Sequence, residues 1–193
     1  MEDSGKDPDT IKSLIIVFSY HHHNTEKIAR AIAGVLGAPV KTPQQVTPGE
    51  LAEYDLVGFG SGIYSGTFGR PVLALVDGLP QSEWKRAFLF STYGAPGFVA
   101  NREFVLKNHA EMRDKLHAKG YEVIGEFGCA GWNTNSFLKY FGGLNKGRPD
   151  ENDLANAEAF ARELRENAGT RAGGNGAHKP SYRQKKTAPR SNR

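Results

Sequence analysis

Blocks of apolar residues alternate along the chain with amphipathic stretches, and this pattern predicts strands and helices in turn. A short run rich in Leu, Ile, Val and Phe is typical of a strand buried on both faces of a parallel sheet. A longer stretch with apolar residues three or four positions apart is typical of a helix that packs on one face. The expected strands are 13–18, 38–41, 55–60, 86–91 and 121–127. The expected helices are 25–36, 104–119 and 153–167, together with a shorter one that starts at Pro71 and covers 72–77.

Strands that alternate with helices predict an α/β fold in which a parallel sheet carries helices on both faces. The five strands fit a doubly wound sheet with the order 2-1-3-4-5. Ligands of such sheets bind at the carboxyl ends of the strands, at the point where the winding reverses. We therefore expect the loops 19–25, 61–70 and 92–101 to converge on one site.

The loop after the first strand is rich in hydroxyl, amide and imidazole groups. Because it leads directly into a helix, its backbone N–H groups lie at the positive end of the helix dipole and suit a phosphate group. The loop has neither the Gly-x-Gly-x-x-Gly fingerprint of dinucleotide-binding proteins nor the Gly-Lys-Ser/Thr of P-loop NTPases. The predicted phosphate-binding residues are Ser19, Tyr20, His21, His22, His23, Asn24 and Thr25.

Two other interpretations of the three consecutive histidines stay open. One is a metal site, although the side chains of adjacent residues seldom converge on a single ion. The other is a structural turn that holds no ligand. We predict neither a metal ligand nor a catalytic residue in this chain.

The stretch Phe18-Ser-Tyr-His-His-His-Asn-Thr25, followed by Ala29, resembles the FMN phosphate loop of flavodoxins. In that family an aromatic residue ends the first strand, a hydroxyl-rich loop follows, and Asn-Thr opens the helix. The sequence matches at Phe18, Asn24, Thr25 and Ala29, and it departs at 20–23, where the family has hydroxyl residues and a glycine. The resemblance covers about residues 13–166 and implies a flavodoxin-like fold with FMN as its cofactor.

The resemblance also assigns the other two loops to the flavin ring. Tyr64 and Ile63 stand where flavodoxins place a side chain against the isoalloxazine ring, and aromatic side chains stack favourably on a planar heterocycle. Tyr93 or Phe98 is expected on the opposite side, and Trp132 either borders the flavin or a partner or has a plain packing role. The implied flavin-binding residues are Ser61, Gly62, Ile63, Tyr64, Ser65, Thr92, Tyr93, Gly94 and Gly97.

The function implied by the resemblance is low-potential one-electron transfer between redox partner proteins. The redox chemistry would belong to the flavin, and the protein would hold and tune it. Two alternatives stay open: an FMN-dependent NAD(P)H or quinone oxidoreductase of the same fold, and an interaction module that uses a basic tail. The absence of a nicotinamide fingerprint from the sequence favours the carrier.

The positive charge of the chain is concentrated at its C-terminus. Residues 168–193 carry seven Lys or Arg and no acid, so the first 167 residues have a net charge of −3, the difference between the total of +4 and +7. We expect 1–12 to be a disordered acidic lead-in, 13–167 a flavodoxin-like domain and 168–193 a disordered basic tail. The tail suits an anionic partner, such as nucleic acid, an acidic protein or an anionic membrane surface, or else acts as a solubilising extension.

Cysteine use and hydropathy suggest a cytoplasmic protein. The single cysteine, Cys129, excludes an internal disulfide framework and fits a reducing compartment. With no base beside it in the sequence, we expect Cys129 to be a small buried residue. No apolar run approaches the ~18 residues that a membrane span requires, and the N-terminus lacks the layout of a secretory signal.

Overall fold

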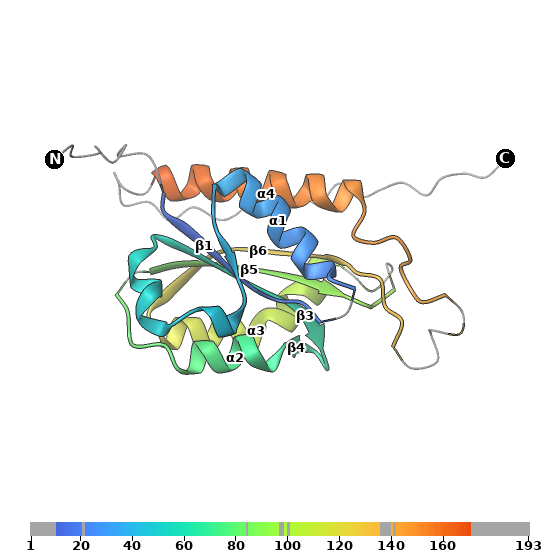
Figure 1. Ribbon diagram of the computed structural model, residues 1–193, viewed down its shortest axis with the longest axis horizontal. Helices are drawn as coiled ribbons and strands as arrows, with labels where there is room; N and C mark the ends of the chain where they lie inside the picture. The colour runs from blue at the N-terminus through green and yellow to red at the C-terminus, as the bar shows by residue number, and fades with distance from the viewer. Residues whose placement is uncertain are drawn as a thin grey trace.

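The computed structural model describes residues 11–20, 22–83, 85–96, 99, 101–135, 140 and 142–170. In these ranges a parallel sheet lies between two layers of helices (Figure 1). The sheet has the order β2-β1-β3-β5-β6, with β1 (Ser13–Phe18), β2 (Val40–Lys41), β3 (Leu56–Tyr64), β5 (Lys85–Tyr93) and β6 (Tyr121–Ala130). The helices are α1 (Asn24–Leu36), α2 (Arg70–Asp77), α3 (Arg102–Ala118) and α4 (Glu151–Thr170), with 3₁₀ turns at η1 (Pro43–Gln45) and η2 (Pro48–Glu53).

The strand order confirms the predicted doubly wound sheet. The short strand β4 (Thr67–Phe68) pairs only with the end of β3, and without it the order is 2-1-3-4-5. All other strand pairs are parallel. The winding reverses between β1 and β3, so the loops that follow these strands open at one edge of the sheet.

The two faces of the sheet bury separate halves of the apolar core. α1 and α4 cover one face, and α2 and α3 cover the other (Figure 1). Successive side chains of a strand point to opposite faces, so Ile15 and Val17 pack in the α1 and α4 layer, whereas Leu14 and Ile16 pack in the α2 and α3 layer. Burying each such side chain contributes about 1.5–3 kcal/mol. This double burial is the reason that β1 is a continuous apolar run.

The second expected loop is a β-hairpin rather than an open loop. β3 continues to Tyr64, and Ile63 and Tyr64 pair with Phe68 and Thr67 of the antiparallel β4. The two turn residues both have positive φ, 52° at Ser65 and 89° at Gly66, as a two-residue type I′ hairpin turn requires. The glycines after residue 60 suggested a loop, but the cross-strand pairing outweighs their low strand preference.

The last helix is longer than expected. α4 continues to Thr170, so residues 168–170, which the sequence assigned to the tail, are helical. Ala168 is 3% exposed, and its carbonyl oxygen accepts a hydrogen bond of 2.6 Å from Arg86 Nη1. Most of the lead-in, 1–10, and the rest of the tail, 171–193, lie outside the described residues. Within the described ranges, no helix has the length and apolar character needed to cross a lipid bilayer.

Candidate functional site

The carboxyl ends of β1, β3 and β5 open on a cleft with about 440 Å³ of free space, part of it open to solvent. The structure brings nine of the predicted site residues together there, from all three expected loops: Ser19, Asn24, Thr25, Gly62, Ile63, Tyr64, Thr92, Tyr93 and Gly94. The segment after β6, in which the sequence left the role of Trp132 open, adds Gly131, Trp132, Asn133 and Asn135.

The start of α1 lies at this cleft. His22 and His23 have left-handed backbone conformations, with φ of 54° and 52°, and they turn the chain from the loop into the helix. The first N–H groups of a helix have no partner within it. Asn24, 7% exposed, donates from Nδ2 to the carbonyl of Trp132 at 2.9 Å, whereas its Oδ1 is buried without a hydrogen-bond partner among the described residues. This end of α1 therefore offers both backbone donors and an unsatisfied acceptor.

Thr25 is held by a second hydroxyl. Its Oγ1 lies 2.8 Å from Oγ1 of Thr92, and the two residues are 1% and 5% exposed. One hydroxyl of the pair donates to the other, so only one of the two hydroxyl hydrogens is left over for a ligand. The pair joins the start of α1 to the end of β5.

The side chains of His22 and His23 do not line the cleft. The His22 ring stacks on Trp132, with ring centroids 4.1 Å apart and planes at 23°, and its Nε2 lies 2.7 Å from Thr134 Oγ1. His23 is exposed, and its Nδ1 lies 2.8 Å from Glu26 Oε2. The described residues contain no group of three His, Cys, Asp or Glu that could hold a metal ion. The other predicted residues of this loop are Tyr20, which is 71% exposed, and His21, which lies outside the described residues.

Tyr64 folds back from the hairpin over the end of β3. A Cβ atom placed on Gly62 would lie 2.9 Å from the Tyr64 hydroxyl oxygen, so a larger residue at this position would displace the end of the Tyr64 side chain. The ring centroid lies 6.2 Å from that of Phe18, and the ring planes make an angle of 57°. Burial raises the pKa of Tyr64, and a backbone hydrogen bond from Tyr20 opposes that rise. Tyr64 thus presents a neutral aromatic ring between the first loop and the hairpin.

Ser61 and Ser65, which were also predicted as site residues, shape the hairpin instead of lining the cleft. Ser61 is fully buried, and its Oγ donates to the Gly62 carbonyl at 2.7 Å and accepts from the Gly69 N–H at 2.8 Å. Ser65 occupies the turn. Both residues fix the path of the backbone around the cleft.

Tyr93 is more deeply buried than its predicted stacking role requires. It is 6% exposed, and its ring packs edge-on against Phe104, with centroids 5.2 Å apart. Burial raises the pKa of Tyr93 far above its ordinary value, so the hydroxyl stays protonated. The alternative residue Phe98, and Gly97 beside it, lie outside the described residues. Trp132 is therefore the described aromatic residue, besides Tyr64, that borders the open part of the cleft.

Asparagine side chains join the fourth wall of the cleft to the third loop. Asn145 donates from Nδ2 to the Ala95 carbonyl at 3.0 Å, and Asn133 donates to the Gly94 carbonyl at 3.4 Å. The Gly131 N–H donates to the Tyr93 carbonyl at 2.9 Å. The segment 131–145 contains three asparagines and a tryptophan without a strong apolar period, and this composition was the available sequence signal.

Cys129 is a buried packing residue, as expected. It is 6% exposed and lies among the apolar side chains under α1 and α4. Burial raises the pKa of its thiol well above the ordinary value, so Cys129 stays a neutral thiol at pH 7.

Solved structures share the fold of this chain at low sequence identity. A flavodoxin from the domain Archaea is 18% identical with a TM-score of 0.58, over 82% of this chain and 99% of that one. Oxidised flavodoxin 2 from Bacillus cereus is 20% identical with a TM-score of 0.59, over 81% and 99% of the two chains. Rubredoxin oxygen:oxidoreductase from Desulfovibrio gigas is 14% identical with a TM-score of 0.58, and the match covers 86% of this chain but 39% of that protein.

Sequence comparison finds a relative at much higher identity. No protein-family model matches the chain. The uncharacterized protein MJ0298 of Methanocaldococcus jannaschii is 43% identical over 159 residues, which span 81% of this chain and 100% of that protein. The chain therefore belongs to the family of MJ0298 and has a flavodoxin-like fold.

Proposed function

We propose that this protein binds FMN in the cleft and transfers single electrons between redox partner proteins. The observation that carries the proposal is the start of α1, where free helical N–H groups and the unsatisfied Oδ1 of Asn24 meet at a cleft lined by glycines. A phosphate group suits the N–H donors. Hydroxyl groups beside that phosphate, such as those of a ribityl chain, suit the Asn24 acceptor.

The residues of the first loop would hold the phosphate end of the ligand. The backbone N–H groups of Asn24 and Thr25 and the hydroxyl of Ser19 are donors at this end of the cleft. No described lining residue carries a positive charge, so neutral donors and the helix dipole would bind the phosphate.

The residues of the other walls would hold the ring. Tyr64 and Trp132 supply aromatic surfaces, and the backbone of Gly62 and of Thr92–Gly94 supplies donors and acceptors for the ring edges. The flavin would supply the electron-accepting chemistry when bound.

The composition of the lining favours a carrier over an enzyme that turns over a substrate. Among the described lining residues there is no Asp, Glu, His, Lys, Arg or Cys to act as acid, base or nucleophile. A lining of this kind also makes additional negative charge costly, because few groups compensate it. Both properties support low-potential electron donation.

The phosphate assignment is tested by comparing FMN with riboflavin, which lacks the phosphate. The wild-type chain is expected to bind FMN at least about tenfold more tightly, a difference of about 1.4 kcal/mol. Asn24→Asp places a negative charge beside the phosphate and is expected to lose that preference. Asn156→Asp, at an exposed position on α4, is the matched control and should keep it. Equal affinity of the wild-type chain for the two flavins would contradict the proposal.

The carrier and oxidoreductase alternatives are separated by turnover. The FMN-loaded protein is mixed with NADH or NADPH and a quinone, and oxidation of the nicotinamide is followed by absorbance. A carrier shows no sustained turnover but exchanges electrons with a redox protein. Oxidation of many NADH or NADPH molecules by each protein molecule would favour the oxidoreductase.

The basic C-terminal segment supports a separate proposal about partners. Residues 171–193 carry seven Lys or Arg and no acid, and they suit an anionic partner. Binding to nucleic acid or to anionic vesicles that weakens steeply with salt, and that is lost on removal of this segment, is the expected result. The single buried cysteine supports a cytoplasmic setting for both roles.

A further inference from the structure

A chain of hydrogen-bonded polar side chains crosses the interior on the α3 side of the sheet. His109 of α3 is fully buried, and its Nε2 lies 2.8 Å from Ser91 Oγ on β5. Its Nδ1 lies 3.0 Å from Glu126 Oε2 on β6, and Arg113 Nη1 lies 2.6 Å from Glu126 Oε1. Because both ring nitrogens of this buried histidine have hydrogen-bond partners, the partners determine which nitrogen carries the proton.

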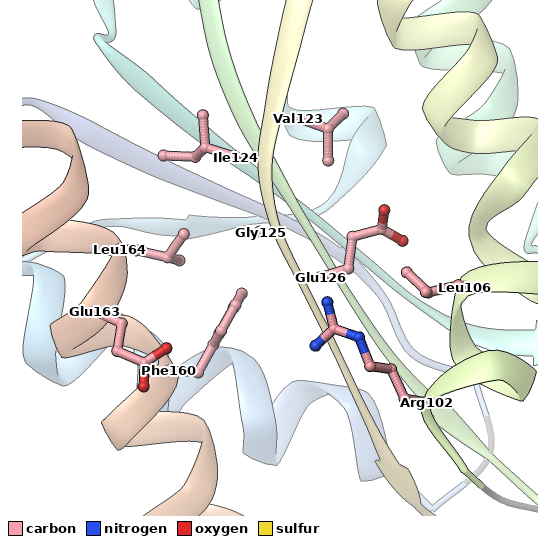
Figure 2. Close-up of a pocket in the computed structure, with 9 residues that line it drawn as sticks. All are labelled: Arg102, Leu106, Val123, Ile124, Gly125, Glu126, Phe160, Glu163 and Leu164. Carbon is pink, nitrogen blue, oxygen red and sulfur yellow. The ribbon is translucent and has the colours of Figure 1, made fainter. Parts of the chain in front are cut away.

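The outer end of this row of hydrogen-bonded side chains, at Glu126, reaches solvent. Figure 2 shows the Glu126 side chain on the α3 side of β6, near Arg102 and Leu106, whereas Phe160 of α4 lies on the other side of the strand. All four residues line a hollow along β6. The hollow has about 500 Å³ of free space, and the Glu126 side chain is 10% exposed. Protons can therefore exchange with the polar chain at this end.

The inner end of this row of hydrogen-bonded side chains, at Ser91, lies beside the cleft. Ser91 directly precedes Thr92, which lines the cleft, and consecutive Cα atoms are about 3.8 Å apart. The His109 ring also packs edge-on against Phe68 of the hairpin, with centroids 5.0 Å apart. The residue before Phe68 in β4, Thr67, donates from its hydroxyl to Glu111 Oε2 of α3 at 2.7 Å. His109 thus contacts both elements that frame the ring end of the cleft.

The partners of His109 fix its neutral form. The Glu126 carboxylate accepts from Nδ1–H, so Nε2 accepts from the Ser91 hydroxyl. The groups that face the ring from β5 and β4 are Ser91 and Phe68, both uncharged. The facing charges are Glu126 of β6 and, behind it, Arg113 of α3. On the α2 side, Lys115, six residues further along α3, pairs with Asp77 of α2.

A second proton on His109 would change both charge and geometry beneath the cleft. It would bind at Nε2, which would then donate to Ser91 Oγ instead of accepting from it. The polar chain would change from a net charge of zero, with Glu126 and Arg113 balanced, to +1. A positive charge at this position favours a negative charge in the cleft.

We propose that His109 is a positioning residue that couples proton uptake to the charge of the cleft. The inference rests on the proposed flavin function. When an external one-electron donor adds one electron to the bound flavin, His109 would take up one proton from solvent at Nε2 while Nδ1–H stays on Glu126, so the total charge would be unchanged. Reoxidation by a one-electron acceptor releases both the electron and the proton.

The test is a potentiometric titration of the FMN-loaded full-length chain between pH 5 and 9. His109→Gln is expected to lose the part of the pH dependence of the first-electron potential that the wild-type protein shows as this histidine titrates. The control is His117→Gln, an exposed histidine on the same helix, which should follow the wild-type curve. Superimposable curves for wild type and His109→Gln would overturn the proposal.

A second measurement needs no substitution. The ring protons of His109 are titrated by NMR in the oxidised and the reduced protein, and the midpoint is expected to be higher in the reduced state. Equal midpoints in the two states would overturn the coupling while leaving the flavin function intact. A chain that takes up no FMN would instead overturn the proposed function, and the coupling with it.

Discussion

The hydroxyl oxygens of Thr25 and Thr92 lie 2.8 Å apart and join the first turn of α1 to the carboxyl end of β5. Both side chains are almost fully buried. Thr25→Val keeps the shape of the side chain but leaves the Thr92 hydroxyl without its partner. The free energy of unfolding is expected to fall by about 1–3 kcal/mol, as measured by urea denaturation.

The double variant provides the control for this prediction. Thr25→Val with Thr92→Val removes both hydroxyls, so no buried group is left unpaired, and its destabilisation should be smaller than the sum of the two single changes. Strict additivity would mean that the two hydroxyls do not interact in solution.

Tyr64 is expected to determine the environment of the flavin ring. Tyr64→Ala removes the aromatic surface over Gly62, and FMN binding should weaken by about 0.5–1.5 kcal/mol with a shift of the visible absorption bands. Tyr64→Phe retains the ring and should retain most of the affinity. The measurement is a fluorescence titration with FMN, and identical spectra for wild type and Tyr64→Ala would place the ring elsewhere.

The stability of the fold should fall in mildly acidic solution. Burial lowers the pKa of His109 below its ordinary value of 6.5, so the unfolded chain binds more protons than the folded one as the pH falls through that value. The free energy of unfolding should therefore decrease from pH 7.5 to 5.5, and His109→Gln should flatten this decrease.

Carboxylates add a second decrease at lower pH. Burial acts to raise the pKa of Glu126, but hydrogen bonds from His109 and Arg113 outweigh it and hold the pKa below its ordinary value of 4.5. Stability from this group is present above pH 4.5 and is lost as the pH falls through the lowered value. Urea denaturation at each pH measures both effects, and a constant free energy of unfolding from pH 7.5 to 5.5 would exclude the first.

Two truncations separate the last turn of α4 from the tail. A chain that ends at Thr170 should keep the stability and the FMN affinity of the full chain, because it retains every described contact of α4. A chain that ends at Asn167 loses buried Ala168 and the carbonyl that accepts from Arg86. Its free energy of unfolding should be lower by about 1–3 kcal/mol. Equal stability of the two truncated chains would show that the last turn is dispensable.

The layers and strand order of the fold follow from the sequence because they depend on local periodicity. Strands such as 13–18 are buried on both faces and need continuous apolar side chains, and such a run can be recognised from the sequence alone. The hairpin was missed because glycine usually weakens strands. Within the part of β3 that was predicted, Gly58 and Gly60 are tolerated because Phe88 and Phe90 of the neighbouring strand fill the space of the missing side chains, which only the register of β3 and β5 discloses.

The candidate site was predictable in its first three walls, whereas the fourth wall was left open, with Trp132 as its one candidate residue. The loops after β1, β3 and β5 are fixed by topology once the strand order is known. The contacts of Trp132, Asn133 and Asn145 join residues that are distant in sequence, and polar side chains carry no periodic signal that would indicate their partners. The same reason hid the contact between His109 and Glu126.

The amide of Asn24 depends on a carbonyl at residue 132, and this has a consequence for biosynthesis. A ribosome that has released only the first half of the chain has made the N-terminal loop but not the segment that closes over it. The nascent polypeptide cannot complete this pocket until the C-terminal third has emerged, so the proposed binding of FMN would follow translation of nearly the whole domain.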